Sequence, residues 1–304
     1  MTLTELRYIV MLAKEQHFGR AAERCFVSQP TLSIAVKKLE EELGVALFER
    51  TKSRVHPTPV GVRVVEQAQR VLEQTSAIKD LADEGKDQLS SPLALGAIYT
   101  VGPYLFPHMI PRIKEIAPEM PLVIEEGYTA TLRKRLRNGE LDLIIVSLPF
   151  TEPDVVTQTV YEEQFMVLMS SDHPLAAKKT VTTQDLTREN LLMLGEGHCF
   201  RDQILDSSPE LRLAMDESKS SIRTAAEGSS LETLRHMVAS RLGITVVPQS
   251  ATLNAQYRDG LLVTRPFAAP APTRKVALAW RASFPRHKAV DAVRNAIQSC
   301  DLKP

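Results

Sequence analysis

Between residues 93 and 247 the chain alternates short apolar runs with segments of helical period, and this alternation restricts the possible folds more than any other feature. The runs expected to form strands cover residues 93–98, 122–126, 141–147, 165–169, 191–194, 222–225 and 244–247, followed by 261–264 and 276–280. Helical patterns lie near 107–117 and 130–138, after an expected cap at Ser229, and at 287–299. The alternation predicts parallel sheets sandwiched between helices. Proline-rich stretches at 149–153 and 266–272 are expected to carry two crossovers between two α/β lobes, with a ligand cleft at the ends of their strands.

Size and charge narrow the class of protein further. At 304 residues the chain is expected to form about two domains, since ~150 residues per domain is usual. The 37 basic and 37 acidic side chains cancel, which argues against a basic coat for nucleic acid but permits one small basic face. No apolar run approaches the ~18 residues of a membrane span, and the first residues do not resemble a signal peptide. We therefore expect a cytoplasmic protein that does not bind membranes.

The first 58 residues predict a helix-turn-helix followed by two short strand-like pieces around a polar turn. Thr2 and Glu5 fit a capping box, and a second short helix is expected over 20–25. Ser28 is a good N-cap for the next helix, which carries Pro30 in its first turn and ends at Gly44.

Polar residues on this last helix suit DNA. Gln29, Ser33 and Lys37 recur every four residues, so they share a face opposite the apolar residues of the helix. Short amide and hydroxyl groups near a helix N-terminus suit base edges in the major groove. The basic residues of the following turn, Arg50, Lys52 and Arg54, are then placed to hold the phosphate backbone. The alternative is a pair of small amphipathic helices that only pack together.

A helix without internal proline is expected from residue 59 to about 88. Its narrow apolar stripe, which includes Val64, Val71 and Ile78, is flanked by charges of both signs. This pattern fits either a core-facing helix of a single domain or a helix that pairs with a partner, and the narrow stripe favours a dimerisation helix.

The three cysteines are too few and too widely spaced for a disulfide framework, and no Cys/His cluster suggests a metal. Cys199 follows an apolar run and two glycines, and His198 and Arg201 lie beside it. A cationic neighbour or a helix N-terminus favours the thiolate that attacks peroxides, although a lone cysteine after a strand is more often an inert core residue. The chain contains no GxGxxG before a helix, no P-loop and no HExxH, so we expect no cofactor and no metal.

The string RAAERCFVSQPTLSIAVKKLEEELGVALFERTKSRVHPTPVG resembles the N-terminal domain of LysR-type regulators in its alanine pair, its Ser-Gln-Pro and its LE.ELG and LFER segments. The resemblance covers nearly the whole chain. It implies a winged helix-turn-helix rich in α-helix (1–58), a long linker helix that dimerises (59–89) and an α/β regulatory domain (90–304). The two lobes of that domain, of periplasmic-binding-protein-like type, would cover about 90–160 plus 268–304, and 161–267.

The same resemblance implies a regulator and not an enzyme. Its partners would be promoter DNA, RNA polymerase and copies of itself, as a homodimer and a homotetramer. By the match, the base-contacting residues are Gln29, Pro30, Thr31 and Ser33, and the phosphate-contacting residues are Arg50, Lys52 and Arg54.

Three further segments, GEGHCFRDQ, AIYTVGPYLFP and SSLETLRHMVASRLGITVVP, resemble the members of this family that sense hydrogen peroxide. The match implies that Cys199 is the peroxidatic thiol, that Thr100, Thr129 and His198 hold peroxide beside it, and that Arg265 lies near. Those members usually carry a second, resolving cysteine, but here the corresponding position is Ser208. A natural one-cysteine sensor and an engineered replacement both stay open, and the close match elsewhere favours the second.

Four functions compete at this point. The first is a peroxide-responsive regulator of antioxidant genes. The second is a LysR-type regulator that binds a small metabolite between its lobes through Tyr99, Thr100 and Thr129, with Cys199 incidental. A thiol peroxidase would need a resolving thiol and would leave the winged helix without a purpose. A solute-binding protein would need a signal peptide.

Overall fold

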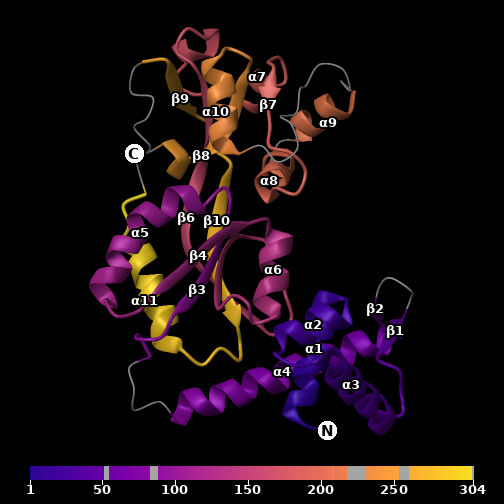
Figure 1. Cartoon of the computed structure of the whole chain (residues 1–304). Helices are drawn as coiled ribbons and strands as arrows, with labels where there is room; N and C mark the ends of the chain where they lie inside the picture. The colour runs from indigo at the N-terminus through magenta and orange to yellow at the C-terminus, as the bar shows by residue number, and fades with distance from the viewer. Residues whose placement is uncertain (51–54, 83–87, 208, 218–229, 253–259, 303–304) are drawn as a thin grey trace. The chain divides into compact units, whose positions relative to one another are not determined.

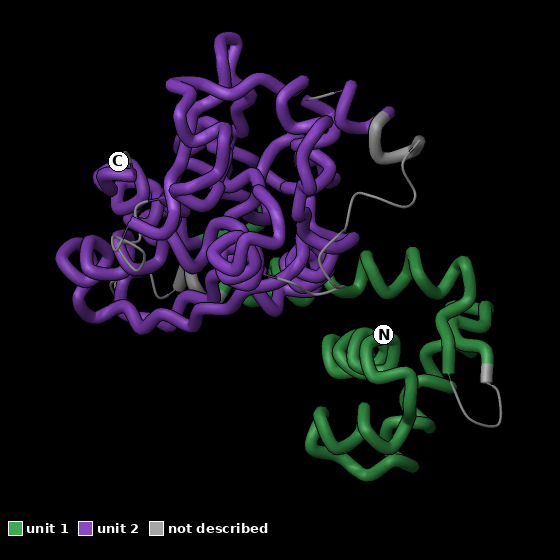
Figure 2. Tube along the Cα trace, turned by 90° about the horizontal axis from the view of Figure 1, so that it is seen from above, with its two compact units in different colours: residues 1–85, 283–285 green, residues 86–282, 286–304 purple. Residues whose placement is uncertain are grey.

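The computed structural model describes residues 1–50, 55–82, 88–207, 209–217, 230–252 and 260–302. The expected strand at 222–225, the expected cap Ser229, and Lys52, Arg54 and Ser208 lie outside these residues. The chain divides into two compact units, residues 1–85 with 283–285 and residues 86–282 with 286–304 (Figure 2).

The first unit contains the expected helix-turn-helix and a two-stranded hairpin. Its elements are α1 (Leu3–Glu15), α2 (Phe18–Arg24), α3 (Gln29–Leu43), β1 (Phe48–Arg50), β2 (Val55–Pro57) and α4 (Pro59–Ala82). The capping box is confirmed, because Glu5 N donates to Thr2 Oγ1 at 3.2 Å and Thr2 N donates to Glu5 Oε2 at 2.7 Å. Ser28 caps α3 and Gly44 ends it in the left-handed region, with φ 70°, as predicted. The second helix was expected to begin at residue 20, but His17 Nδ1 accepts from Gly19 N at 3.1 Å, so α2 begins at Phe18.

The apolar stripe of α4 divides into two parts. Ala68 is buried in the core that the first unit forms, and Val64 packs against that core. Val60, Val71 and Ile78 keep 47%, 36% and 66% of their surface exposed. One side of α4 therefore belongs to the core of its own unit, and the other side has apolar residues in contact with solvent.

The second unit is a mixed α/β structure (Figure 1). Its strands are β3 (Leu93–Ile98), β4 (Leu122–Gly127), β5 (Leu143–Ser147), β6 (Val155–Ser170), β7 (Leu191–Leu192), β8 (Ile244–Pro248), β9 (Leu262–Pro266) and β10 (Thr273–Arg281). Its α-helices are α5 (Gly102–Ile116), α6 (Thr129–Arg137), α7 (Thr183–Leu186), α8 (Cys199–Ser207), α9 (Pro209–Glu217), α10 (Leu231–Ala239) and α11 (His287–Gln298). Two 3₁₀ turns, η1 (Pro174–Ala177) and η2 (Gln249–Thr252), complete the described elements.

The expectation that all strands pair in parallel is wrong, because the sheet is mixed. The described strands have the order β4-β3-β5-β10-β6-β8-β7, with β9 also paired to β6. The pairs β3–β4, β3–β5 and β7–β8 are parallel, whereas β6 and β10 run antiparallel to each other and to their other neighbours. The expected lobe boundary at 160–161 falls inside β6, because this strand pairs with β10 in its first part and with β8 and β9 in its last part. Figure 1 shows β6 and β10 side by side along the axis of the unit.

Three chain segments converge where strands end and helices begin. Tyr99 and Thr100 follow β3, Tyr128 lies between β4 and α6, and Cys199 is the first residue of α8. Ser230, one residue after the expected position, caps α10 by accepting from Thr233 N at 3.1 Å. Among the described residues, no helix combines the length and the apolar composition that a membrane crossing requires.

Candidate functional site

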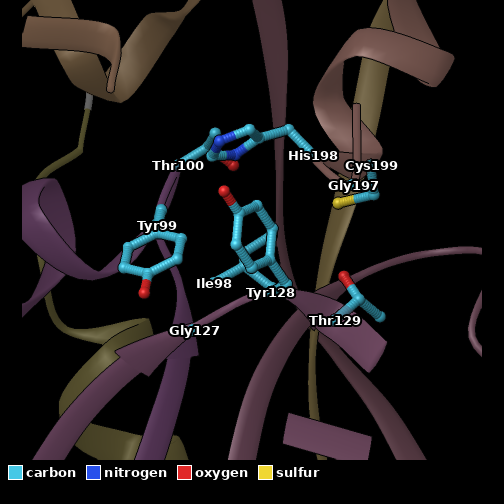
Figure 3. A pocket seen from close by; sticks show the side chains of 9 residues that line it. All are labelled: Ile98, Tyr99, Thr100, Gly127, Tyr128, Thr129, Gly197, His198 and Cys199. Atoms are coloured by element: carbon cyan, nitrogen blue, oxygen red, sulfur yellow. The ribbon is translucent and has the colours of Figure 1, made fainter. Parts of the chain in front are cut away.

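A small pocket lies at the junction of these three segments (Figure 3). It is lined by Ile98, Tyr99, Thr100, Gly127, Tyr128, Thr129, Gly197, His198 and Cys199. Its cavity volume is about 10 Å³. That is about the least space that holds one water molecule, whereas pockets for drug-sized ligands have volumes of roughly 300–1,000 Å³. The pocket therefore suits a molecule of very few atoms.

Cys199 is held half-buried at the N-terminus of α8. Gly197 precedes it with φ +92°, a conformation that residues with side chains rarely adopt, and this turn brings the thiol to the pocket. The first N–H groups of a helix have no acceptor within the helix, so this position favours a negative charge. Arg201, which was expected beside the thiol, instead donates from Nη1 to the carbonyl of Leu194 at 3.2 Å.

Two threonine hydroxyls lie in the same pocket. Thr129 begins α6, and its Oγ1 is buried without a hydrogen-bond partner among the described residues. Thr100 is 3% exposed, and its Oγ1 accepts from Arg274 Nη1 at 2.9 Å. A hydroxyl that accepts a hydrogen bond still has its own proton to donate. The pocket thus has hydrogen-bonding capacity, next to a thiol, that no group of the described residues uses.

Arg274, which was not predicted from the sequence, holds Thr100 in place through hydrogen bonds to its hydroxyl and its carbonyl. Arg274 Nε donates to Glu163 Oε1 at 2.9 Å, and Glu163 Oε2 accepts from Ser250 N at 2.8 Å. Arg274 also donates from Nη2 to the Thr100 carbonyl at 2.8 Å, and its guanidinium carbon lies 5.0 Å from the Phe200 ring centroid. Arg274 on β10 and Glu163 on β6 form a buried ion pair, and separating them would leave a buried charge without its partner. The pair therefore keeps β6, β10 and the Thr100 segment in one arrangement.

Arg265 does not line the pocket. Its Nε and Nη2 donate to the carbonyl of Ala176 at 3.1 and 2.7 Å, and its Nη1 donates to the carbonyl of Thr264 at 2.8 Å. The expectation that Arg265 lies beside Cys199 is therefore corrected, because its guanidinium group is hydrogen-bonded to the carbonyl of Ala176 in η1. Among the described arginines, Arg274 donates hydrogen bonds to a pocket residue, Thr100.

Aromatic rings form one wall of the pocket. The Tyr128 ring lies edge-on to Tyr99 at 5.2 Å and to His198 at 4.8 Å between ring centroids. A methyl group at Gly197 would lie 3.4 Å from the Tyr128 ring. Tyr128 thus packs directly against the segment that carries His198 and Cys199.

Gln203, also missed from the sequence, ties α8 to β5. Its Nε2 donates to Ser147 Oγ at 2.8 Å and to the Leu148 carbonyl at 3.1 Å. The helix that begins with the thiol is therefore attached at its middle to the end of a strand of the other lobe.

The other two cysteines, Cys25 and Cys300, are free thiols whose surroundings disfavour the thiolate form. Burial raises the pKa of Cys25, against an opposing effect of Arg7, and burial raises the pKa of Cys300, against Arg112. Cys300 Sγ also donates to the carbonyl of Ala296 at 3.1 Å. In the part of the chain that the structure describes, no three His, Cys, Asp or Glu side chains group to hold a metal ion.

The predicted DNA-contacting residues of α3 are accessible. Gln29, Pro30, Thr31 and Lys37 are exposed and Ser33 is half-buried. Thr31 Oγ1 lies 2.8 Å from Ser28 Oγ, so its hydroxyl takes part in the helix cap. Arg50 ends β1, and its side chain, like Lys52 and Arg54, is outside the described part.

Comparison with known families gives two matches. Residues 3–62 match the family described as bacterial regulatory helix-turn-helix protein, lysR family, and residues 86–300 match the LysR substrate binding domain. Among individual proteins, the chain is 38% identical over 299 residues to the DNA-binding transcriptional dual regulator OxyR of Escherichia coli K12, covering 98% of this chain and 95% of that protein. It is 36% identical over 285 residues to a probable hydrogen peroxide-inducible genes activator of Mycobacterium avium, covering 94% of this chain and 89% of that protein.

Solved structures agree with these matches. The full-length OxyR C199D from Pseudomonas aeruginosa superposes with a TM-score of 0.85 at 56% identity, covering 100% of this chain and 96% of that chain. A hydrogen-peroxide-bound cysteine-to-serine mutant of OxyR from Corynebacterium glutamicum gives a TM-score of 0.64 at 34% identity, covering 98% of this chain and 91% of that chain.

Proposed function

The chain belongs to the LysR family of bacterial regulators and, within it, to the OxyR group, and from this we propose that it is a DNA-binding transcriptional regulator that senses hydrogen peroxide. Cys199 is the reacting thiol, and its oxidation controls antioxidant genes. The observation that carries this proposal is the buried Thr129 hydroxyl, which has no partner among the described residues and lines the same pocket of about 10 Å³ as Cys199.

The chemistry needs a cysteine sulfur and hydrogen-bond donors, and Cys199, Thr100 and Thr129 line one pocket. The Cys199 thiolate attacks one oxygen of the peroxide, so that a sulfur–oxygen bond forms and the oxygen–oxygen bond breaks. The second oxygen leaves as hydroxide and takes a proton from the water around the site. Thr100 and Thr129 donate hydrogen bonds to the peroxide oxygens and to the charge that develops on the leaving oxygen, a role that preorganised donors perform well. His198 completes the wall beside the thiol.

Oxidation changes the packing that the reduced site requires. A sulfenic acid on Cys199 adds a polar oxygen inside a pocket of about 10 Å³, next to the hydroxyls that line it, and α8 is attached to β5 through Gln203. The oxidised state favours a second arrangement of the segment around residues 195–225, which is how a thiol modification shifts an equilibrium between two packings. With Ser208 in place of a resolving cysteine, the sulfenic acid persists or is over-oxidised. One peroxide is consumed for each signal, so the protein is not an enzyme.

The N-terminal unit supplies the contacts with promoter DNA. Gln29, Pro30, Thr31 and Ser33 contact base edges, and Arg50, Lys52 and Arg54 contact phosphates. Lys37 also contacts the DNA from the exposed part of α3. Dimers that pair through α4 bind half-sites about one helical turn apart, and two dimers form the homotetramer that contacts RNA polymerase. A protein that acts on the chromosome in this way works in the bacterial cytoplasm.

The pocket does not favour a metabolite as the effector. Tyr99, Thr100 and Thr129, which a metabolite would contact, enclose about 10 Å³. A metabolite would need a volume some tens of times larger.

Footprinting on promoter DNA tests the proposal. The protein is reduced, exposed to an equal amount of hydrogen peroxide, and footprinted together with the Cys199→Ser and Cys300→Ser variants. We expect peroxide to change the footprint of the wild type and of Cys300→Ser but not of Cys199→Ser. A footprint that does not respond to peroxide in the wild type, or that responds equally in Cys199→Ser, would contradict the proposal.

A further inference from the structure

An isoleucine occupies the middle of the outward side of α3. Leu32, Val36 and Leu39 are fully buried and define the side that faces the core. Residues three and four apart share a side of a helix, so Pro30, Ile34, Lys37 and Glu41 form the opposite side. Ile34 is 68% exposed in the middle of this outward side.

The surroundings of Ile34 are those of a DNA-contacting surface. Gln29 and Ser33 lie on one flank of the outward side, and Lys37, exposed and 3.5 Å from Glu41, follows one turn later. Pro30, one turn before, is also exposed. Phe26, in the turn that leads into α3, is 95% exposed and has φ 57°. Single exposed apolar residues are common on protein surfaces, but here two of them lie on either side of Pro30 in the segment that contacts DNA.

We propose that Ile34 packs against the 5-methyl group of a thymine in the major groove and selects thymine at one position of each half-site. The inference rests on the proposed DNA-binding function and names the base that this helix side prefers. The thymine methyl is the one apolar group that base edges present in the major groove. Guanine and cytosine present hydrogen-bonding groups there, and an isoleucine side chain placed against them would remove water without replacing its hydrogen bonds.

DNA is the partner expected on this side of α3, because Ile34 is continuous with the residues proposed to contact DNA. Ile34 shares its helix side with a lysine and lies between Pro30 and Lys37, so a helix inserted in the groove brings Ile34 to the bases with them. A second copy of the chain on this side would cover Gln29, Ser33 and Lys37 as well and would exclude DNA.

Removal of single methyl groups from the DNA tests the contact. Full-length protein selects duplexes from a random-sequence library, and each thymine of the selected site is then replaced in turn by deoxyuridine, which lacks only the methyl group. For the wild type we expect one position in each half-site at which the replacement weakens binding by about threefold to fivefold, the effect of one buried methyl-sized group.

Two variants complete the experiment. In Ile34→Ala the same replacement has no effect on affinity, because the side chain that met the methyl group is shortened. In Leu213→Ala, which truncates an aliphatic side chain of similar exposure (61%) on α9, the wild-type sensitivity remains. Equal thermal unfolding midpoints of the variants and the wild type show that folding is kept.

Two results overturn the inference while leaving the DNA-binding function in place. The first is a selected site in which no thymine is sensitive to loss of its methyl group. The second is a sensitivity that Ile34→Ala retains in full. Selection of no DNA by the wild type would overturn the proposed function, and the inference with it.

Discussion

At the residue scale, we expect the Tyr128 ring to select which peroxides reach Cys199, because it lines the pocket beside the thiol. The ring packs against His198 and against the backbone at Gly197, and it closes one side of a pocket of about 10 Å³. We predict that Tyr128→Ala raises the rate of Cys199 oxidation by tert-butyl hydroperoxide, relative to hydrogen peroxide, by about tenfold, which corresponds to ~1.4 kcal/mol of barrier. Tyr128→Phe retains the ring and is expected to retain the wild-type ratio. Stopped-flow kinetics with both peroxides measure the ratio, and an unchanged ratio in Tyr128→Ala would refute this role of the ring.

The other two thiols are expected to react slowly at neutral pH. Burial raises the pKa of Cys25 and of Cys300 above the ordinary value of 9.0. A raised pKa keeps the thiol protonated at pH 7, and the reactive thiolate increases about tenfold for each pH unit until the pH passes the raised pKa. Iodoacetamide labelling of each cysteine between pH 6 and pH 10, followed by peptide mass spectrometry, should show both rates still rising at pH 9. A plateau below pH 8 would contradict the effect of burial.

Most residues that line the pocket could be predicted from the sequence, but Arg274, which holds Thr100 in place, could not. Cys199, His198 and Thr100 belong to segments that match a known pattern, the resemblance adds Thr129, and the structure brings all four together. The contact between Arg274 and Thr100 joins positions 174 residues apart, and nothing local in the sequence indicates it. The choice of Arg265 failed because β9 pairs with β6 away from the pocket, whereas β10 lies between β5 and β6.

At the scale of elements, Gln203 connects α8 to the end of β5 through two hydrogen bonds. Gln203→Ala removes the two hydrogen bonds to Ser147 and Leu148, which together contribute roughly 1–3 kcal/mol. We predict faster amide hydrogen exchange over residues 199–207, by about tenfold or more, in the reduced protein. Gln164→Ala, at an exposed glutamine of β6, is the matched control and is expected to leave exchange in α8 unchanged. Equal exchange in Gln203→Ala and the wild type would show that other contacts hold the helix.

The apolar part of the longest strand, β6, could be predicted from the sequence, and its polar part could not. Residues 165–169 of β6 were identified because they are apolar, but the polar first half of the strand, from Val155, carries no such pattern. Without it, the antiparallel centre of the sheet stayed hidden and parallel pairing was expected throughout. The expected helix near 107–117 begins earlier in the structure, at Gly102, and both Pro107 and Pro111 lie inside it.

At the scale of the whole molecule, the exposed side of α4 predicts self-association. Val60, Val71 and Ile78 remain exposed by 47%, 36% and 66%, and a stripe of this kind is buried when two helices pair. We expect Ile78→Asp to weaken the dimer by more than tenfold in sedimentation equilibrium, because dimerisation would bury an unpaired carboxylate. Val62→Asp changes a residue of the same helix that is off the stripe and 45% exposed, and it should leave the dimer intact. A dimer of unchanged strength in Ile78→Asp would place the interface elsewhere.

The peroxide-sensing role of Cys199 can be tested through the rate at which each thiol of the reduced protein reacts with a near-stoichiometric amount of hydrogen peroxide. Intact-mass analysis with sulfenic-acid trapping, applied to the wild type and to Thr129→Val, measures it. We expect rapid oxidation of Cys199 alone, and a rate at least about tenfold lower in Thr129→Val, which keeps the shape of the side chain but loses the donor. Oxidation of Cys199 no faster than that of Cys25 and Cys300, or equal rates in the two proteins, would contradict this expectation.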